Sequence, residues 1–150
     1  MALRIPPVIL VLIAAFLMWG VATLFPALGF DMLWAVAFSV ELAIVGLAVS
    51  TLGVVAFRQV RTTVNPRAPE LASVLVVAGI YRYTRNPMYL GFLILLVGWA
   101  VFLENAAAFL VLPLFVLYMN RFQIQPEEKA LETLFGQEFV AYKQTVRRWI

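Results

Sequence analysis

Few side chains in this sequence could take part in chemistry. It has no histidine and no cysteine among its 150 residues, which excludes thiolate nucleophiles, Cys/His zinc sites and Ser-His-Asp triads. Two polar clusters stand out, a basic one with Arg82 and Arg85 and, further along the chain, an acidic one with Glu127 and Glu128. Such groups could bind and align a charged ligand, and positioning of that kind can supply much of a catalytic effect.

The elements that must position these clusters are apolar helices. Hydrophobic residues make up 64% of the chain and charged residues 13%, whereas soluble domains carry about a quarter charged residues. A helix needs about 20 mostly apolar residues to cross the hydrocarbon core of a membrane. We therefore predict an all-α integral membrane protein with a single domain over residues 1–150. Its four transmembrane helices are expected at about 8–28, 33–57, 87–103 and 106–122, before a tail over 123–150.

The third and fourth predicted spans are joined by a tight turn at Glu104 and Asn105. Two helices joined in this way form a hairpin, so the residues before the third span and those after the fourth emerge on the same side of the membrane. The arginine cluster and the glutamate cluster are therefore expected to converge at one end of the protein.

The basic residues predict the orientation in the membrane. An even number of spans puts all of them on one side, which by the positive-inside rule is the cytoplasm. We therefore expect both termini in the cytoplasm, and the inner membrane of a bacterium as the location. This distribution indicates topology rather than binding to nucleic acid. The basic residues lie at Arg4, at Arg58, Arg61, Arg67, Arg82 and Arg85, and in the tail from Arg121 to Arg148.

Two further segments lie on the same side. The run Leu71–Ala78 is apolar but too short to span, which favours a strand-like or interfacial segment. The tail carries apolar residues at helical spacing and predicts an amphipathic helix bent at Gly136. That helix either lies in the membrane interface or folds back to cap the cytoplasmic ends of the spans.

The converging clusters favour a ligand with a carboxylate at one end and hydroxyl or cationic groups at the other. The start of the third span adds unpaired N–H groups and a positive dipole end to its two arginines. S-adenosylmethionine has the matching chemistry, and its sulfonium needs no histidine or metal for activation. Neither a Rossmann nor a P-loop nucleotide motif is present. Three tyrosines could line the site: Tyr81, Tyr83 and Tyr89.

The two motifs and their spacing resemble the isoprenylcysteine carboxyl methyltransferase family, with which phospholipid N-methyltransferases share a membrane core. The run YRYTRNPMYLG, the hairpin, Glu127-Glu128-x-x-Leu131 and then Phe135-Gly136 with Tyr142 carry the resemblance. It covers about Thr62–Ile150, while the first two helices match in character only. The resemblance implies cofactor binding by Tyr81, Arg85, Asn86, Pro87, Tyr89, Gly91, Glu127 and Glu128. Asn86 stands where many eukaryotic members have histidine, which removes any proton shuttle through an imidazole.

The expected function is an S-adenosylmethionine-dependent membrane methyltransferase. The cofactor would lie between the third helix start, the fourth helix end and the folded-back tail, with no metal. A lipophilic methyl acceptor would enter from the bilayer, membrane lipids would be the other partners, and the oligomeric state stays open. Arg82 or Arg121 would orient an acidic acceptor, and Glu128 would assist deprotonation of an amine.

Each motif also has a structural interpretation. Asn86-Pro87 resembles a helix cap with a first-turn proline, and Glu127 with Glu128 resembles a helix start. The arginines could be topology anchors and the tyrosines an interfacial belt. Glu41, inside the second span, is interpreted as structural or interfacial. Three small residues are interpreted as helix packing: Gly46, Ser50 and Gly53.

Two rival functions remain open. One is a membrane reductase that uses NADPH, because sterol reductases have a related membrane core. The other is a non-catalytic subunit that binds lipid, in which the tail helix matters and Arg85 does not.

Overall fold

A computed structural model describes residues 5–59 and 74–150. The predictions that concern Arg4, Arg61, Arg67 and the first residues of Leu71–Ala78 lie outside these ranges. The remainder of that segment, from Val74 to Ala78, is an irregular connection with Val76 buried.

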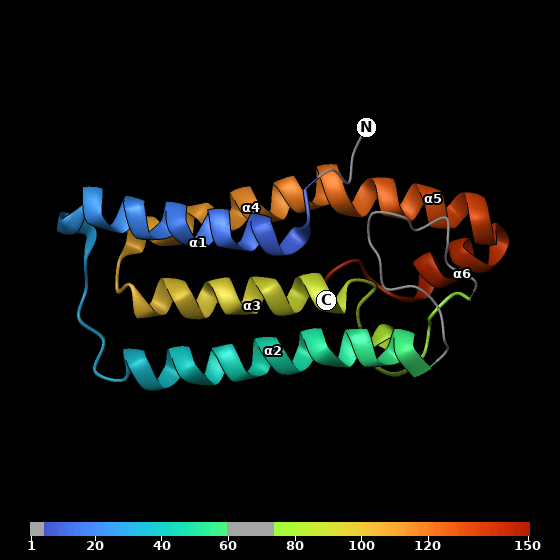
Figure 1. Ribbon diagram of the computed structural model, residues 1–150, viewed down its shortest axis with the longest axis horizontal. Helices are drawn as coiled ribbons and strands as arrows, with labels where there is room; N and C mark the ends of the chain where they lie inside the picture. The colour runs from blue at the N-terminus through green and yellow to red at the C-terminus, as the bar shows by residue number, and fades with distance from the viewer. Residues whose placement is uncertain (1–4, 60–73) are drawn as a thin grey trace.

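The described chain is a bundle of long helices, as Figure 1 shows. It contains no β-strand within residues 5–59 and 74–150, which confirms the all-α class. Short 3-10 helices cover Pro26–Leu28, Gly79–Arg82 and Ala106–Leu110, and a π-helical turn covers Asn120–Ile124. The α-helices are α1 (Pro7–Leu24), α2 (Ala35–Gln59), α3 (Pro87–Phe102), α4 (Val111–Met119), α5 (Gln125–Phe135) and α6 (Gln137–Thr145).

Three of the helical stretches are long and apolar enough to cross a membrane. They are Pro7–Leu24, Ala35–Gln59 and the continuous run Ala106–Phe135. The third predicted span is the apolar helix α3, but its 16 residues rise only about 24 Å, less than a hydrocarbon core of about 30 Å. The chain is therefore a membrane protein with three candidate spans by length within residues 5–59 and 74–150, and the predicted count of four is not confirmed.

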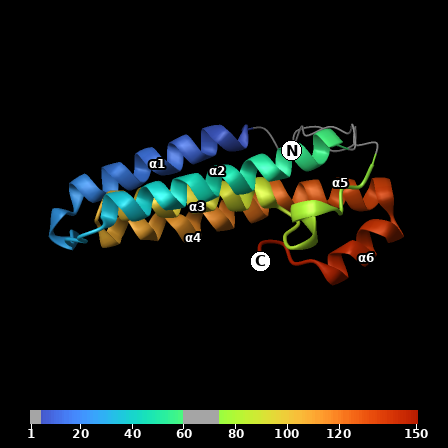
Figure 2. The same ribbon diagram turned by 90° about the horizontal axis from the view of Figure 1, so that it is seen from below.

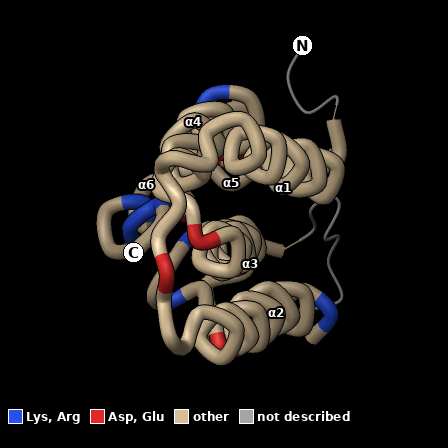
Figure 3. The backbone as a smooth tube through the Cα atoms, turned by 90° about the vertical axis from the view of Figure 1, so that its left-hand side faces the viewer, with Lys and Arg blue, Asp and Glu red and all other residues tan. Residues whose placement is uncertain are grey.

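The long helices lie side by side with their connections at the two ends of the bundle. Glu104 Oε1 accepts a hydrogen bond from Met32 N (2.8 Å), and Glu104 O accepts one from Phe30 N (2.8 Å). These bonds hold the α3–α4 turn beside the α1–α2 connection. Figure 3 looks along the bundle from this end and shows acidic colour on both connections. The described basic residues lie toward the opposite end, where the polar clusters meet.

Close packing of small residues joins α2 to α3, which lie together in Figure 2. A Cβ added at Gly46 would lie 2.7 Å from Gly91 O, and one added at Gly91 would collide with Ser50 Oγ. Ser50 Oγ donates a hydrogen bond to Met88 O at 3.1 Å. The interpretation of Gly46 and Ser50 as packing residues is confirmed, and Gly91 belongs to the same interface.

The sequence predicts that the fourth helix ends at Phe122, and this prediction is wrong. The helix continues through the π-helical turn into α5 and includes Pro126, because Gln125 N bonds to Asn120 O five residues back. A proline inside an ordinary α-helix leaves a carbonyl unpaired, and a π turn is one way to accommodate it. The turn also keeps Ile124 in line with the buried positions of α4: Phe115 and Met119 are four residues apart, and Ile124, the last residue of the turn, follows after five.

The predicted bend at Gly136 is confirmed. Gly136 has φ 54° and separates α5 from α6. Past this turn the chain folds back toward the start of α3, as Figure 2 shows, so the tail caps one end of the bundle.

Candidate functional site

The start of α3 is anchored to the end of the chain. Pro87 is the first helical residue, as its fixed φ favours. Asn86 precedes it, but its side chain does not cap the helix. The amide Nδ2 of Asn86 instead donates to Arg148 O at 2.9 Å. Asn86 is therefore placed by its bond to the chain end, and the capping interpretation is wrong.

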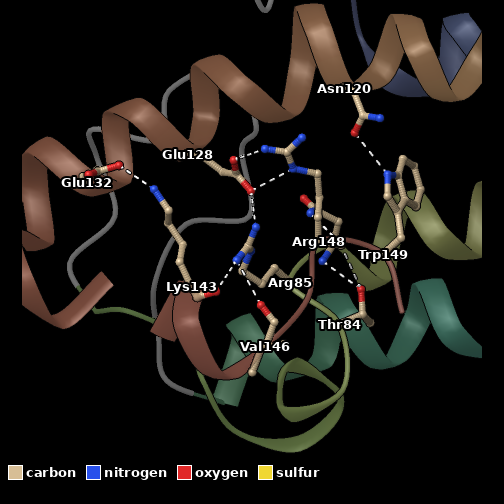
Figure 4. Close-up of polar contacts among 10 residues, drawn as sticks. Thr84, Arg85, Asn120, Glu128, Glu132, Lys143, Val146, Arg148 and Trp149 are labelled. Carbon is tan, nitrogen blue, oxygen red and sulfur yellow. Dashed lines mark hydrogen bonds and ion pairs between the residues drawn. The ribbon is translucent and has the colours of Figure 1, made fainter. Parts of the chain in front are cut away.

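Arg85 makes the densest set of polar contacts. Its Nη1 donates to the carbonyl oxygens of Lys143 and Val146, both at 2.9 Å, and its Nη2 donates to Glu128 Oε1 at 2.9 Å (Figure 4). The side chain is 11% exposed. Its Nε is buried and has no hydrogen-bond partner among the described residues. This leaves one buried donor for an additional acceptor.

Glu128 lies between two arginines (Figure 4). Besides Arg85 it accepts two bonds from Arg148, from Nε at 3.1 Å and from Nη2 at 2.6 Å. The Glu128 side chain is 12% exposed, so it would be costly to leave unpaired. Because α5 continues directly from the π turn, Glu127 and Glu128 do not stand at a free helix start. Both acids do lie in the first turn of α5, as the helix-start interpretation has it, but their side chains pair with the Arg85–Tyr89 motif and with Arg148.

Glu127 faces a different partner. The buried hydroxyl of Tyr89 donates to Glu127 Oε2 at 3.1 Å. The two adjacent glutamates therefore contact two different parts of the Arg85–Tyr89 motif. Residues that are far apart in the sequence meet at one place.

A small cavity of about 50 Å³ lies between these groups. Tyr142 helps to close it by donating a hydrogen bond to Tyr81 O at 2.7 Å. Burial raises the pKa of the Tyr142 phenol well above its ordinary value, so the hydroxyl stays protonated and remains a donor. The polar and aromatic lining comprises Phe57, Tyr81, Arg85, Asn86, Tyr89, Glu127, Glu128, Phe139 and Tyr142.

Six of the predicted site residues line the cavity, and the others do not. Those that line the cavity are Tyr81, Arg85, Asn86, Tyr89, Glu127 and Glu128. Pro87 is buried in the first turn of α3, and Gly91 packs against α2, outside the cavity lining.

The remaining candidates lie at the surface. Arg82 and Arg121 are exposed and do not line the cavity, and Arg121 bonds to Gln125 at 3.5 Å. Tyr83 is 78% exposed. Glu41 is exposed in the second turn of α2, at the opposite end of that helix from the cavity residue Phe57.

Sequence reasoning missed Arg148 as a site residue and counted it only among the basic residues of the tail. Its partner Glu128 is 20 residues away, and no local spacing links the two. It also missed the aromatic walls supplied by Phe57 and Phe139. For Phe139 a signal existed, because it lies on the same apolar stripe as Leu131 and Tyr142.

The residues present fit S-adenosylmethionine in chemical type. The buried Nε of Arg85 could donate to a carboxylate, and the two glutamates could accept from ammonium or hydroxyl groups. Aromatic faces such as those of Tyr81 and Phe139 suit a sulfonium and a nucleobase.

Fold and site together define a multi-helix membrane protein that encloses a charged and aromatic cavity at one end of its bundle. A family model described as "Phospholipid methyltransferase" matches residues 34–138. The chain belongs to this family, which confirms the family resemblance drawn from the motifs.

Named relatives agree with this assignment. A protein-S-isoprenylcysteine O-methyltransferase B of Arabidopsis thaliana is 38% identical over 72 residues, covering 48% of this chain and 36% of that protein. A rice protein (Oryza sativa subsp. indica), "Probable protein-S-isoprenylcysteine O-methyltransferase", is 35% identical over 129 residues, covering 83% of this chain and 65% of the relative. An uncharacterized protein of Haemophilus influenzae is 48% identical over 63 residues, which are 42% of this chain and the whole of that protein. The chain thus spans less than two thirds of the length of these named methyltransferases.

Proposed function

We propose that this protein is an S-adenosylmethionine-dependent methyltransferase that methylates a lipophilic acceptor in the membrane. The observation that carries the proposal is the meeting of two sequence motifs at one cavity, through the Arg85–Glu128 ion pair and the Tyr89–Glu127 hydrogen bond. Membership of a methyltransferase family supports the same reaction class.

The proposed cofactor contacts follow from the donors and acceptors in the cavity. Arg85 would hold the carboxylate of the methionine part, and Glu127 with Glu128 would hold ammonium or hydroxyl groups. Tyr81 and Phe139 would pack against the nucleobase. The cofactor supplies a methyl group already activated on a sulfonium, so the protein's own task is binding and alignment.

The proposed acceptor is an apolar molecule that reaches the site from the lipid bilayer. A water-soluble acceptor would not require a site built on the ends of membrane helices. If the acceptor is an amine, we propose Glu127, rather than the Glu128 expected from the sequence, as the carboxylate that takes up its proton. Glu127 lines the cavity and accepts one hydrogen bond, from Tyr89, whereas Glu128 is paired with two arginines. We propose that the cavity end faces the cytoplasm, in the inner membrane of a bacterium, because the basic residues gather there.

Calorimetry on the purified protein tests the cofactor. We expect saturable binding of S-adenosylmethionine and none of NADPH. Binding of NADPH alone would favour a membrane reductase instead.

A transfer assay tests the activity. The protein is incubated with tritium-labelled S-adenosylmethionine and a lipid extract, and we expect label in the lipid fraction. Cofactor binding without transfer to any lipid would remove the proposed acceptor class, and absence of both would remove the enzyme.

A further inference from the structure

The last part of the chain, residues 137–150, is joined to the rest at a single glycine, and we call it the C-terminal lid. Gly136 has φ +54°, and a Cβ added there would meet nothing within 4 Å. The turn therefore depends on the glycine backbone rather than on close packing. The helical part of the lid contributes Phe139 and Tyr142 to an apolar cluster that is separate from the bundle core.

The lid closes the cavity. Phe139 and Tyr142 form part of its wall, and the cavity holds only about 50 Å³. Sites for ligands the size of a nucleotide are typically about 300–1,000 Å³. In the arrangement observed, the cavity is too small for S-adenosylmethionine. The wall most simply displaced is the helical part of the lid, whose apolar cluster is separate from the bundle core. The end of the lid is held more firmly, because Trp149 packs against that core and donates to Asn120 Oδ1 at 3.0 Å.

Polar contacts fasten the lid to the α3 start and to α5. Arg85 N donates to Arg147 O at 3.0 Å, and Arg85 Nη1 bonds the carbonyls of Lys143 and Val146. Arg148 pairs with Glu128 at 2.6 Å, while its own backbone oxygen accepts from Asn86. Among these residues, Arg85, Asn86 and Glu128 also line the cavity. A ligand that engages Glu128 therefore competes with Arg148 for the carboxylate.

We infer that the C-terminal lid opens about Gly136 to admit the ligand, and that Arg148 is a positioning residue that holds the lid closed through Glu128. The identity of the ligand rests on the proposed function, whereas the movement of the lid does not. Arg148 suits this role because its side chain is 31% exposed. When its pair with Glu128 breaks, the Arg148 guanidinium stays in contact with solvent, so its charge is not left buried.

A cross-link tests the movement. The chain has no cysteine, so Thr84→Cys with Arg147→Cys introduces a single pair of thiols. Position 84 directly precedes Arg85, whose N donates to Arg147 O at 3.0 Å, and it is buried while the lid is closed. A short thiol-to-thiol reagent then ties the lid to the α3 start. We expect association of S-adenosylmethionine with the cross-linked protein to be at least tenfold slower than with the untreated double variant.

The single-cysteine variants, treated with the same reagent, control for modification alone. Equal association rates with and without the cross-link would overturn the lid and leave the proposed function standing. If the untreated protein binds no S-adenosylmethionine, the proposed cofactor is wrong, and the lid is then judged by an experiment that needs no ligand.

Hydrogen exchange of the unliganded protein provides that experiment. We expect the amides of α6 to exchange as one unit, and Arg148→Gln to speed their exchange at least tenfold while α3 is unchanged. Lys143→Gln is the matched control, because it removes an ion pair between the lid and Glu132 whose side chains are 32% and 44% exposed. Unchanged α6 exchange in Arg148→Gln would overturn the role of Arg148.

Discussion

Glu128 is the residue on which most of the site's polar contacts depend. It binds Arg85 and Arg148 together, and both arginines also hold backbone or side-chain groups around the cavity. Hydrogen bonds to charged groups contribute about 1.5–3 kcal/mol each. Within the described residues, the neighbouring Glu127 carboxylate accepts its hydrogen bond from Tyr89 instead, so the two acids are separable by mutation.

Replacement of Glu128 by Gln removes the charge and keeps the shape. We expect the affinity for S-adenosylmethionine to fall by about 10- to 100-fold, which corresponds to the loss of one charged hydrogen bond. Isothermal titration calorimetry measures this affinity. Glu132→Gln is the control, since Glu132 pairs with Lys143 at 2.8 Å in an exposed ion pair, and its affinity should match that of the unmodified protein. Equal losses in both variants would contradict a specific role for Glu128.

Replacement of Tyr89 by Phe removes the hydroxyl that donates to Glu127. We expect kcat/KM for methyl transfer to fall about tenfold, because a buried carboxylate without its donor is poorly oriented and costly to keep charged. Tyr83→Phe is the control, because Tyr83 is 78% exposed. A Tyr89→Phe variant with full activity would exclude Glu127 from the chemistry.

At the scale of the helices, the sequence indicated most starts and stops but not how the helices face one another. Pro87 and Gly136 marked boundaries that the structure has, because their backbone constraints are local. The continuation of the fourth helix past Phe122 was missed, since Pro126 suggests a helix start unless a π turn precedes it. Gly91 was predicted to contact the ligand because it belongs to the same motif as Arg85 and Tyr89. In the structure, the side of α3 on which Gly91 lies packs against α2.

Replacement of Gly91 by Ala tests the packing of α2 on α3. The added methyl group would collide with Ser50 and with the backbone of Gly46, and overpacking of this kind costs about 1–3 kcal/mol. We expect a lower unfolding temperature in detergent. Gly20→Ala is the control, because a Cβ at Gly20 meets nothing within 4 Å and alanine favours the helix. A Gly91→Ala variant of full stability but lower cofactor affinity would return Gly91 to the site.

At the scale of the whole molecule, the convergence of the two polar clusters could be predicted from the hairpin and the charge distribution alone. The partners within the cluster could not, because they depend on how the tail folds back. Arg148 shows this most clearly, as it reaches Glu128 only after the chain reverses at Gly136. The number of membrane crossings also cannot be predicted from helix length alone, since α3 has only 16 residues and is shorter than a typical span.

Labelling of single cysteines decides whether α3 crosses the membrane. Leu33 in the α1–α2 connection is 88% exposed and Tyr83 before α3 is 78% exposed. The bond from Phe30 N to Glu104 O keeps the α3–α4 turn at the end where Leu33 lies. We expect Leu33→Cys to react with an impermeant maleimide on intact cells, and Tyr83→Cys only after permeabilisation. Reaction of both from one side would rule out four crossings.

The central claim is that the cavity between the two motifs is the cofactor site. Determination of the structure with S-adenosylhomocysteine, the demethylated form of the proposed cofactor, tests it most directly. We predict a nucleotide in this cavity, with its base against Tyr81 and Phe139, its amino-acid end at Arg85 and the Arg148–Glu128 pair altered. A nucleotide bound elsewhere, with these side chains still paired as they are in Figure 4, would contradict the account.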